Sequence, residues 1–263
     1  MRFSEGLAAA YFGVMVVAAW LRPLPASRRA HVTMAGTLTG AAIWRLPHDA
    51  SPMVRDWAPA VLILLGYWVS GRFFVGSSPS FEAWLMAWDR RLLGDPATRF
   101  ARWPRVVLAY LDVVYLGCFL LIPAGFAALS WTGRGAMADR YWTMVIAAEF
   151  GAFAPLSVVQ TRPPWALERR SAQRERAIHQ LASEMVGTFT IGANTFPSGH
   201  VAGSFAVAMA VSGAMPWIGG ILFALAASIS VACVAGRYHY TVDVVAGAVL
   251  ALATWGLVRA AGV

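Results

Sequence analysis

Residues 197–215 read PSGHVAGSFAVAMAVSGAM, and they lie inside a longer stretch, Met185–Gly236, that contains no Asp, Glu, Lys or Arg. The next charged residues are Arg237 and Asp243, with His239 between them. Apolar runs of this length predict membrane-spanning helices. Ionisable groups at membrane depth are costly to keep, so those at the edges of such a run are candidates for a functional role.

The composition of the whole chain agrees with this interpretation. Its 263 residues are 59% hydrophobic and 13% charged, with a mean hydropathy of +0.59, whereas soluble domains carry about 25% charged residues. The apolar residues come in long runs and not at amphipathic spacing. We therefore expect an all-α, polytopic membrane helical bundle that forms a single domain over residues 1–263.

Eight membrane segments are predicted, at residues 6–20, 30–44, 57–75, 106–130, 141–160, 200–215, 217–235 and 240–258. The first two form an N-terminal addition within residues 1–56, and the other six form a catalytic core over 57–263. The segment 30–44 is short, and Pro123 is expected to interrupt the segment 106–130.

Two further segments are predicted to lie along the membrane surface. In residues 81–93, apolar residues share one helical face and charged residues the other, which is typical of an interfacial helix. The apolar residues are Trp84, Leu85, Trp88 and Leu92, and the charged ones are Asp89, Arg90 and Arg91. The polar insertion 161–195 contains apolar residues at helical spacing: Ile178, Leu181, Ala182 and Met185.

The predicted topology brings several polar residues to one membrane face. Arg162 follows the fifth segment, His200 begins the sixth, and Arg237 and His239 fall between the seventh and eighth. Asp243 lies four residues after His239, so the two side chains share a helical face. Each residue alone has an ordinary explanation, such as a helix-start turn or a snorkelling arginine. Their joint occurrence on one face favours an active site.

The spacing of His239 and Asp243 suits nucleophilic catalysis. A carboxylate bonded to one imidazole nitrogen fixes the tautomer and leaves the other nitrogen free to attack. Attack on phosphorus would form a covalent phosphohistidine. His200 would protonate the leaving alkoxide and later activate the acceptor as a base. We therefore expect His239, Asp243 and His200 to be the catalytic residues.

Four residues are candidates for binding the phosphate. The amides of Ser198 and Gly199 lie at the predicted start of a helix, where unpaired N–H groups and the helix dipole favour an anion. Arg162 and Arg237 carry forked, permanently charged donors that suit nonbridging oxygens.

Three signatures resemble those of the type 2 phosphatidic acid phosphatase superfamily: Arg162-Pro163, then Pro197-Ser198-Gly199-His200, then His239-x-x-x-Asp243 followed by Ala246-Gly247. The resemblance covers the six-helix core. It implies His239 as nucleophile, Asp243 as its partner, His200 as acid and base, and a mechanism without metal. The family usually has a Lys at the position of Pro155 and an Arg at that of Cys233, and Arg237 is a candidate substitute for the latter. The segment 88–94, WDRRLLG, resembles the branch that contains inositol phosphorylceramide synthases.

Two acidic residues within membrane segments, Asp112 and Glu149, admit either structural pairing or a functional role. Asp112, with Tyr115 one turn away, is the preferred functional candidate. We expect it either to contact the lipid head group or to hold residues that do. Cys118 and Cys233 have no partners at metal-ligand spacing and are expected to be buried hydrophobes. We expect no cofactor and no metal.

Charge gives two further expectations. The net charge of +8 comes entirely from arginines, which suits either base composition with the positive-inside effect or attraction to anionic lipids. Most arginines lie in loops on the catalytic side, which would place the site in the cytoplasm, whereas relatives of the family in bacteria act on the outer face. The side is left open. We expect an integral protein of a bacterial inner (cell) membrane.

Three functions compete. The first is a membrane-embedded phosphatase acting on a lipid phosphate or pyrophosphate, with a phospholipid or isoprenoid phosphate as substrate and no nucleic acid partner. The second is a phosphotransferase that moves a phospho-head-group to a lipid hydroxyl. The third is a non-catalytic transporter or scaffold, which would have no need of a second imidazole at His200.

Overall fold

The chain folds into a bundle of helices. The computed structural model describes residues 1–167 and 191–262. The helices are α1 (Phe3–Leu21), α2 (Ala26–Asp49), α3 (Pro52–Gly71), α4 (Pro79–Leu93), α5 (Pro96–Ala101), α6 (Arg105–Trp131), α7 (Ala138–Phe153), α8 (Pro164–Leu167), α10 (Gly199–Ser212), α11 (Pro216–Ala235) and α12 (Thr241–Ala260). Two short 3-10 helices, η1 (Gly135–Met137) and η2 (Ala154–Ser157), flank α7. The described residues contain no β-strand beyond one isolated bridge, Thr161–Asn194. The predicted all-α class is confirmed.

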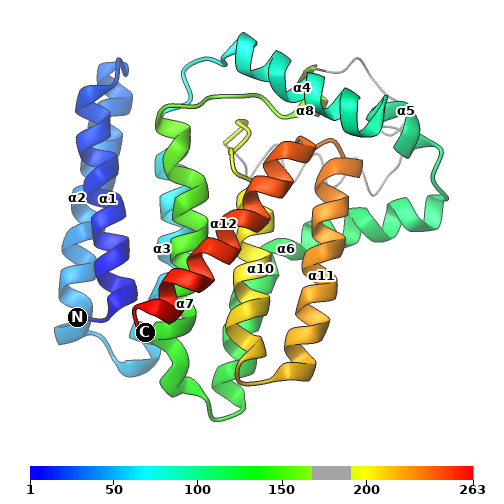
Figure 1. Cartoon of the computed structure of the whole chain (residues 1–263). Helices are drawn as coiled ribbons and strands as arrows, with labels where there is room; N and C mark the ends of the chain where they lie inside the picture. Colours follow the sequence, from blue (N-terminus) through cyan, green and yellow to red (C-terminus); the bar gives the residue numbers. More distant parts are fainter. Residues whose placement is uncertain (168–190, 263) are drawn as a thin grey trace.

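Helix α10 lies at the centre of the bundle and packs against α6, α7, α11 and α12. Most of its residues are buried, because small and β-branched side chains let the neighbouring helices approach closely. The pair α1 and α2 packs along α3 and α7 at one side (Figure 1). Helices α4 and α5 lie across one end of the bundle, and both chain termini lie toward the other end (Figure 1).

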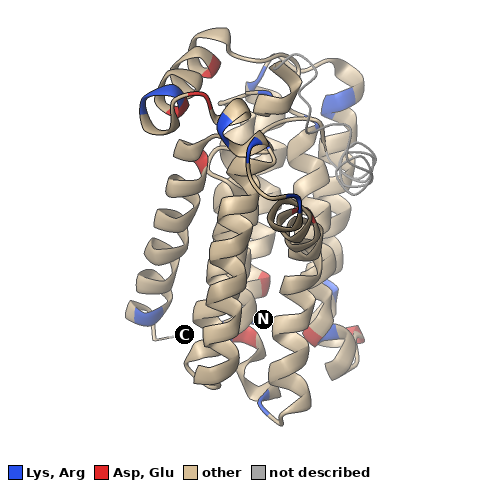
Figure 2. Ribbon diagram, turned by 90° about the vertical axis from the view of Figure 1, so that its right-hand side faces the viewer, with Lys and Arg blue, Asp and Glu red and all other residues tan. Residues whose placement is uncertain are grey.

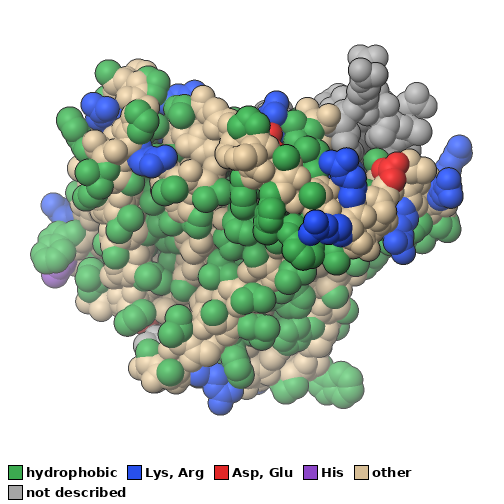
Figure 3. All heavy atoms as spheres, turned by 45° about the horizontal axis from the view of Figure 1, so that its top comes forward, with side chains coloured by type: hydrophobic (Ala, Val, Ile, Leu, Met, Phe, Trp, Pro, Cys, Tyr) green, Lys and Arg blue, Asp and Glu red, His purple; other side chains and the backbone are tan. Residues whose placement is uncertain are grey.

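Within the described residues, four helices are long and apolar enough to cross a membrane: α1, α6, α11 and α12. The charged residues gather mostly toward the two ends of the bundle, and long middle stretches of the helices carry none (Figure 2). In a view tilted to bring the α4 end forward, arginines surround a surface rich in hydrophobic side chains (Figure 3). These features indicate an integral membrane protein.

Several predicted helix boundaries need correction. The second segment, expected to be short at 30–44, is the 24-residue helix α2. Its last turn carries the ion pair Arg45–Asp49 at 2.5 Å, an i,i+4 pair that supports helix beyond Trp44. Pro123 does not interrupt α6, which is continuous from Arg105 to Trp131. Proline is tolerated inside a membrane helix where neighbouring helices can hydrogen-bond the backbone group that it leaves free. The fifth segment, predicted as 141–160, ends as α-helix at Phe153.

The surface segments have different outcomes. A helix is present at the segment predicted at 81–93, as α4. The predicted division into two faces is wrong in part, because Asp89 is buried beside Leu85, whereas Trp84 and Leu92 are exposed. The predicted helix around Ile178, Leu181, Ala182 and Met185 lies outside the described residues.

Candidate active site

The predicted site residues lie where several elements meet at the α4 end of the bundle. Helices α10 and α12 both begin there, α11 ends there, and the segment after η2 returns to the same end (Figure 1). The topology expected from the sequence is therefore present, and it collects His200, His239, Asp243, Arg162 and Arg237.

The turn between α11 and α12 presents His239 to the site. Arg237 adopts a left-handed backbone conformation with φ of 60°, and its N–H donates to the Val234 carbonyl at 3.1 Å. The amides of Tyr238 and His239 both donate to the Cys233 carbonyl at 3.0 Å. This is a Schellman motif, which usually places glycine in the left-handed position. Arginine in this conformation is less stable than glycine by about 1 kcal/mol. We therefore expect the Arg237 side chain to make a contact that offsets this loss.

His239 and Asp243 face each other across the first turn of α12. His239 Nδ1 lies 3.5 Å from Asp243 Oδ2. The same oxygen accepts hydrogen bonds from Asn194 Nδ2 at 2.8 Å and from the Tyr240 N–H at 3.1 Å. Asn194 is itself held by Thr161 Oγ1 at 3.0 Å. Two hydrogen bonds therefore hold the Asp243 carboxyl beside the imidazole, although the 3.5 Å separation from His239 Nδ1 is too long for a hydrogen bond.

His200 lies on the opposite side of the His239 ring. The distance from His200 Nδ1 to His239 Nε2 is 3.3 Å. The His200 ring stacks on Tyr115, with ring centroids 5.1 Å apart, and Tyr115 stacks in turn on Tyr238 at 3.8 Å. Tyr115 therefore positions the second imidazole, and the two histidines lie close enough to act on one phosphoryl group.

Burial controls the protonation of His239. The residue is 4% exposed, and burial lowers the pKa of its imidazole to about 3. At neutral pH the ring is therefore uncharged, which is the nucleophilic form of an imidazole.

Two arginines that the sequence nominates for phosphate are engaged by acids of α4. Arg237 Nη1 lies 3.0 Å from Asp89 Oδ2, and the other oxygen of Asp89 accepts the Thr241 N–H at 2.8 Å. Arg162 forms a two-point pair with Glu82 at 2.8 and 3.1 Å. Burial alone would raise the pKa of Glu82, but its hydrogen bonds from Arg162 hold that pKa below its usual range. Neither arginine lines the cavity that His239 and His200 share.

The predicted anion site at the start of α10 is also occupied by protein groups. The Ser198 N–H donates to the Asp243 carbonyl at 3.1 Å, and the Gly199 N–H lies 3.4 Å from Thr195 Oγ1. Both residues are buried. A phosphate would have to displace these contacts to use the two amides.

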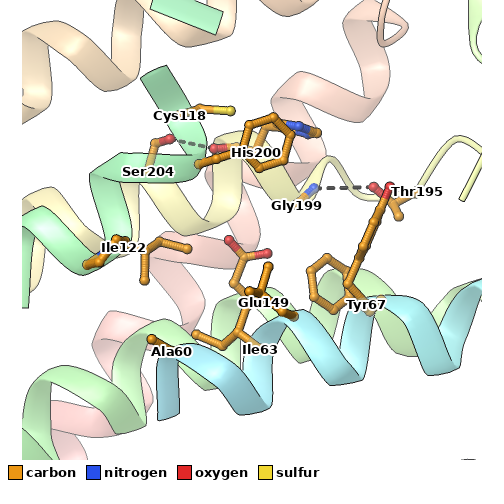
Figure 4. A pocket seen from close by; sticks show the side chains of 14 residues that line it. Ala60, Ile63, Tyr67, Cys118, Ile122, Glu149, Thr195, Gly199, His200 and Ser204 are labelled. Atoms are coloured by element: carbon orange, nitrogen blue, oxygen red, sulfur yellow. Dashed lines mark hydrogen bonds between the residues drawn. The ribbon is translucent and has the colours of Figure 1, made fainter. Parts of the chain in front are cut away.

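Two cavities lined by described residues flank His200. The smaller, of about 30 Å³, lies between the two histidines and the aromatic rings of Tyr67, Tyr115 and Trp165. It has room for about one water molecule. The larger, of about 150 Å³, extends into the bundle between α3, α6, α7 and α10, and Figure 4 shows His200 and Glu149 in its wall.

The sequence model of the PAP2 superfamily matches residues 83–257, which span α4 to most of α12. The chain belongs to the PAP2 superfamily. The resemblance to type 2 phosphatidic acid phosphatases is thereby confirmed, and membership supports a phosphatase-type function on lipid phosphates. No curated protein and no solved structure matches the chain.

The positions where the chain departs from the PAP2 pattern have clear structural settings. Cys233, at the usual arginine position, is fully buried, and its carbonyl closes the turn that carries His239. Pro155, at the usual lysine position, lies in η2. The described part of the chain contains no group of three His, Cys, Asp or Glu side chains arranged to hold a metal ion.

The sequence favours Asp112 over Glu149 as a functional residue, whereas in the structure it is Glu149 that lies beside the site. Asp112 is buried on α6, and neither cavity beside His200 includes it, whereas Glu149 lines the larger one. Asn194, Glu82 and Asp89 were not nominated, although each contacts a nominated residue. The closeness of Asn194 to Pro197, three residues later, was the only feature of the sequence that could have placed it at the site. Asp89 was interpreted as part of the polar face of an interfacial helix, and Glu82 was given no role.

Proposed function

We propose that the protein is a membrane-embedded phosphatase of lipid phosphates or pyrophosphates that acts through a phosphohistidine at His239. The observation that carries this proposal is the line of three groups: Asp243 Oδ2 lies 3.5 Å from His239 Nδ1, and His239 Nε2 lies 3.3 Å from His200 Nδ1. This order supplies an orienting carboxyl, a neutral nucleophile and an acid in one row.

In the first step, His239 Nε2 attacks phosphorus, a P–N bond forms and the P–O bond to the lipid alcohol breaks. His200 enters this step in its protonated form, with the proton that the phosphate monoester brings into the site, and it gives that proton to the departing alkoxide and becomes neutral. In the second step, His200 takes a proton from water, the water oxygen attacks phosphorus, and the P–N bond breaks to release phosphate and free His239. The mechanism uses no metal ion, and each histidine ends in its starting state.

The ligand-free geometry requires the two rings to separate. In-line displacement places the leaving oxygen on the far side of phosphorus from the attacking nitrogen. A phosphoryl group must therefore lie between His239 Nε2 and His200, where the free cavity holds about one water molecule. Rotation of the His200 side chain toward the larger cavity would open this space, because that cavity lies on its other side.

Arginine donors complete the proposed phosphate site. Each guanidinium has five N–H donors, so Arg237 and Arg162 could bind nonbridging oxygens while they keep part of their contact with Asp89 and Glu82. The Ser198 and Gly199 amides would join if the phosphate displaces the Asp243 carbonyl and Thr195.

A second candidate is phosphotransfer to a lipid hydroxyl, which the larger cavity favours because it gives His200 an apolar space on the side away from His239. The chemistry is the same, with an alcohol replacing water in the second step. We propose a bacterial inner membrane as the location. The four apolar helices among the described residues support insertion into a bilayer.

One experiment tests both candidates. Purified protein is incubated with a ³²P-labelled lipid phosphate, quenched in alkali and analysed for acid-labile, alkali-stable protein-bound phosphate. We expect label in the wild type and none in His239→Ala. Addition of a hydroxylated lipid then separates the candidates, since free phosphate indicates hydrolysis and a new labelled lipid indicates transfer. Turnover with no trapped label, and unchanged in His239→Ala, would contradict the proposed intermediate.

A further inference from the structure

The larger cavity beside His200 has the chemistry of a binding site for part of a lipid. Its volume is about 150 Å³, comparable to a cavity that holds a benzene-sized ligand. Hydrophobic side chains such as Ile63, Phe119 and Ile122 supply most of its wall. Figure 4 shows Glu149 among them, with its carboxyl group pointing toward α10 and the space below His200.

Glu149 is out of place in such a wall. Its side chain is 6% exposed, and within the described residues its carboxyl group has no hydrogen bond and no ion pair. A buried carboxyl without a partner is unfavourable by an amount comparable to a lost hydrogen bond or more. Polar groups of this kind persist inside a membrane bundle when they serve a function.

The central helix is shaped to accept this carboxyl group. A Cβ atom at Gly203 would lie 1.9 Å from Glu149 Oε1, and one at Gly199 would lie 3.1 Å from Glu149 Oε2. Only glycine leaves room for the carboxyl at position 203. The acid is therefore seated against the first turns of α10, the same turns that carry His200.

The cavity also has a path to the lipid. Leu64 on α3 and Phe119 on α6 line it, and both are more than two-fifths exposed on the outer surface of the bundle. Helices α3 and α6 do not pack closely along their length, although Trp57 and Phe126 touch edge to face nearer the far end. An acyl or alkyl chain could leave the cavity between α3 and α6.

We propose that this cavity holds the part of the lipid next to the phosphate ester, and that Glu149 accepts a hydrogen bond from it. The donor would be a hydroxyl, amine or amide N–H a few bonds from the ester oxygen. The inference rests on the proposed function for the position of the phosphate. It narrows the substrate class to lipid phosphates with such a donor and disfavours isoprenoid phosphates, whose chains have none.

Binding of the alcohol part alone tests the site without turnover. The full chain in detergent micelles is titrated with 1-oleoylglycerol, which has two free hydroxyls, and with propyl oleate, which has the same chain and none. The rise in melting temperature with ligand concentration gives the concentration at which half of the protein is bound. We expect the wild type to prefer 1-oleoylglycerol by about tenfold, the value of one hydrogen bond to an acid.

Two variants assign the preference to Glu149. Glu149→Met keeps the length of the side chain and removes the acceptor, so the preference should disappear. Ile63→Val removes one methyl group from the same wall and should retain it. A wild type that binds both ligands equally overturns the proposal whatever the variants do, and so does a Glu149→Met protein that keeps the preference.

Turnover separates this inference from the proposed function. The substrates are 1-oleoylglycerol 3-phosphate and its 2-deoxy analogue, and we expect kcat/KM to favour the first by about tenfold in the wild type only. If both are hydrolysed equally, the phosphatase stands and the role of Glu149 falls. If neither is hydrolysed while the binding preference follows Glu149, the lipid site stands and the catalytic proposal falls.

Discussion

At the scale of single residues, the imidazole of His239 has both of its nitrogens directed at groups that the mechanism uses, Asp243 on one side and His200 on the other. Replacing His239 by Ala should lower kcat by at least about three orders of magnitude, because no other side chain can take the place of the proposed covalent nucleophile. His31, an exposed histidine on α2, gives a matched control, and His31→Ala should keep full activity. A His239→Ala protein with a tenth of wild-type activity would rule out the nucleophile.

The orienting carboxyl can be tested separately. Asp243→Asn keeps the size of the side chain but changes which imidazole nitrogen carries the proton, so kcat should fall by roughly three to four orders of magnitude. The trapped phosphohistidine of the labelling experiment should fall in parallel. An Asp243→Asn variant that accumulates more label than the wild type would show instead that Asp243 acts mainly in the second step.

The protonation state of His239 gives a prediction in pH. Since burial lowers its pKa to about 3, acidification from pH 7 to 5 should leave the ring neutral, and protonation should begin only well below the pKa of about 6.5 of a free imidazole. Histidine-labelled protein followed by NMR measures this directly, and the His239→Gln variant assigns the resonance. A His239 resonance that titrates near pH 6.5 would contradict the buried, neutral nucleophile.

Arg237 tests whether a guanidinium reaches the phosphate. Arg237→Lys keeps the charge but loses the forked geometry, so turnover should fall by roughly one to two orders of magnitude. Inhibition by vanadate, which mimics the transferred phosphoryl group, should weaken to a similar degree if the guanidinium binds phosphate. Cys233→Ala is the control and should be nearly silent, because the turn uses only its carbonyl. Unchanged turnover in Arg237→Lys would leave phosphate binding to Arg162 and the amides of α10.

At the scale of elements, α4 joins the site through two ion pairs that differ in burial. The Arg237 side chain is 5% exposed beside Asp89, whereas the Arg162 side chain is 44% exposed beside Glu82. Removing one partner of a fully buried pair is destabilising by about 3–5 kcal/mol. The loss is smaller where the remaining partner, here Arg162, stays in contact with solvent. Asp89→Asn should therefore lower the melting temperature much more than Glu82→Gln. Equal effects would mean that α4 is held by its apolar face and not by Asp89.

The elements also show what the sequence could predict. Long apolar runs located the helices of the core, since burial in lipid leaves few alternatives to helix. The ends of α2, α3 and α7 were misplaced, because they depend on local pairs such as Arg45–Asp49 and on turns that hydropathy does not record. The row of His200, His239 and Asp243 followed from spacing and topology. The partners of Arg162 and Arg237 did not, since both come from α4, far away in the sequence.

At the scale of the whole molecule, the described residues offer no cluster of metal ligands, so activity should survive EDTA. Vanadate should inhibit, because it resembles phosphorus in the transfer step. Both are measured on the same purified preparation, with release of phosphate as the readout. Loss of activity in EDTA that added divalent metal restores would contradict a mechanism based on histidine alone.

The pairing of Asp89 with Arg237 has a consequence for how the protein is made. The two residues are 148 positions apart, so α4 is synthesised and delivered to the membrane long before its partner leaves the ribosome. During that interval the Asp89 carboxylate has to stay in contact with water. A helix that lies at the bilayer surface allows this contact, whereas a spanning helix would bury the carboxylate in lipid. The catalytic end of the bundle can therefore close only when α11 and α12 have been inserted. A nascent chain that stalls earlier would carry an open, inactive site with an unpaired acid at the membrane surface.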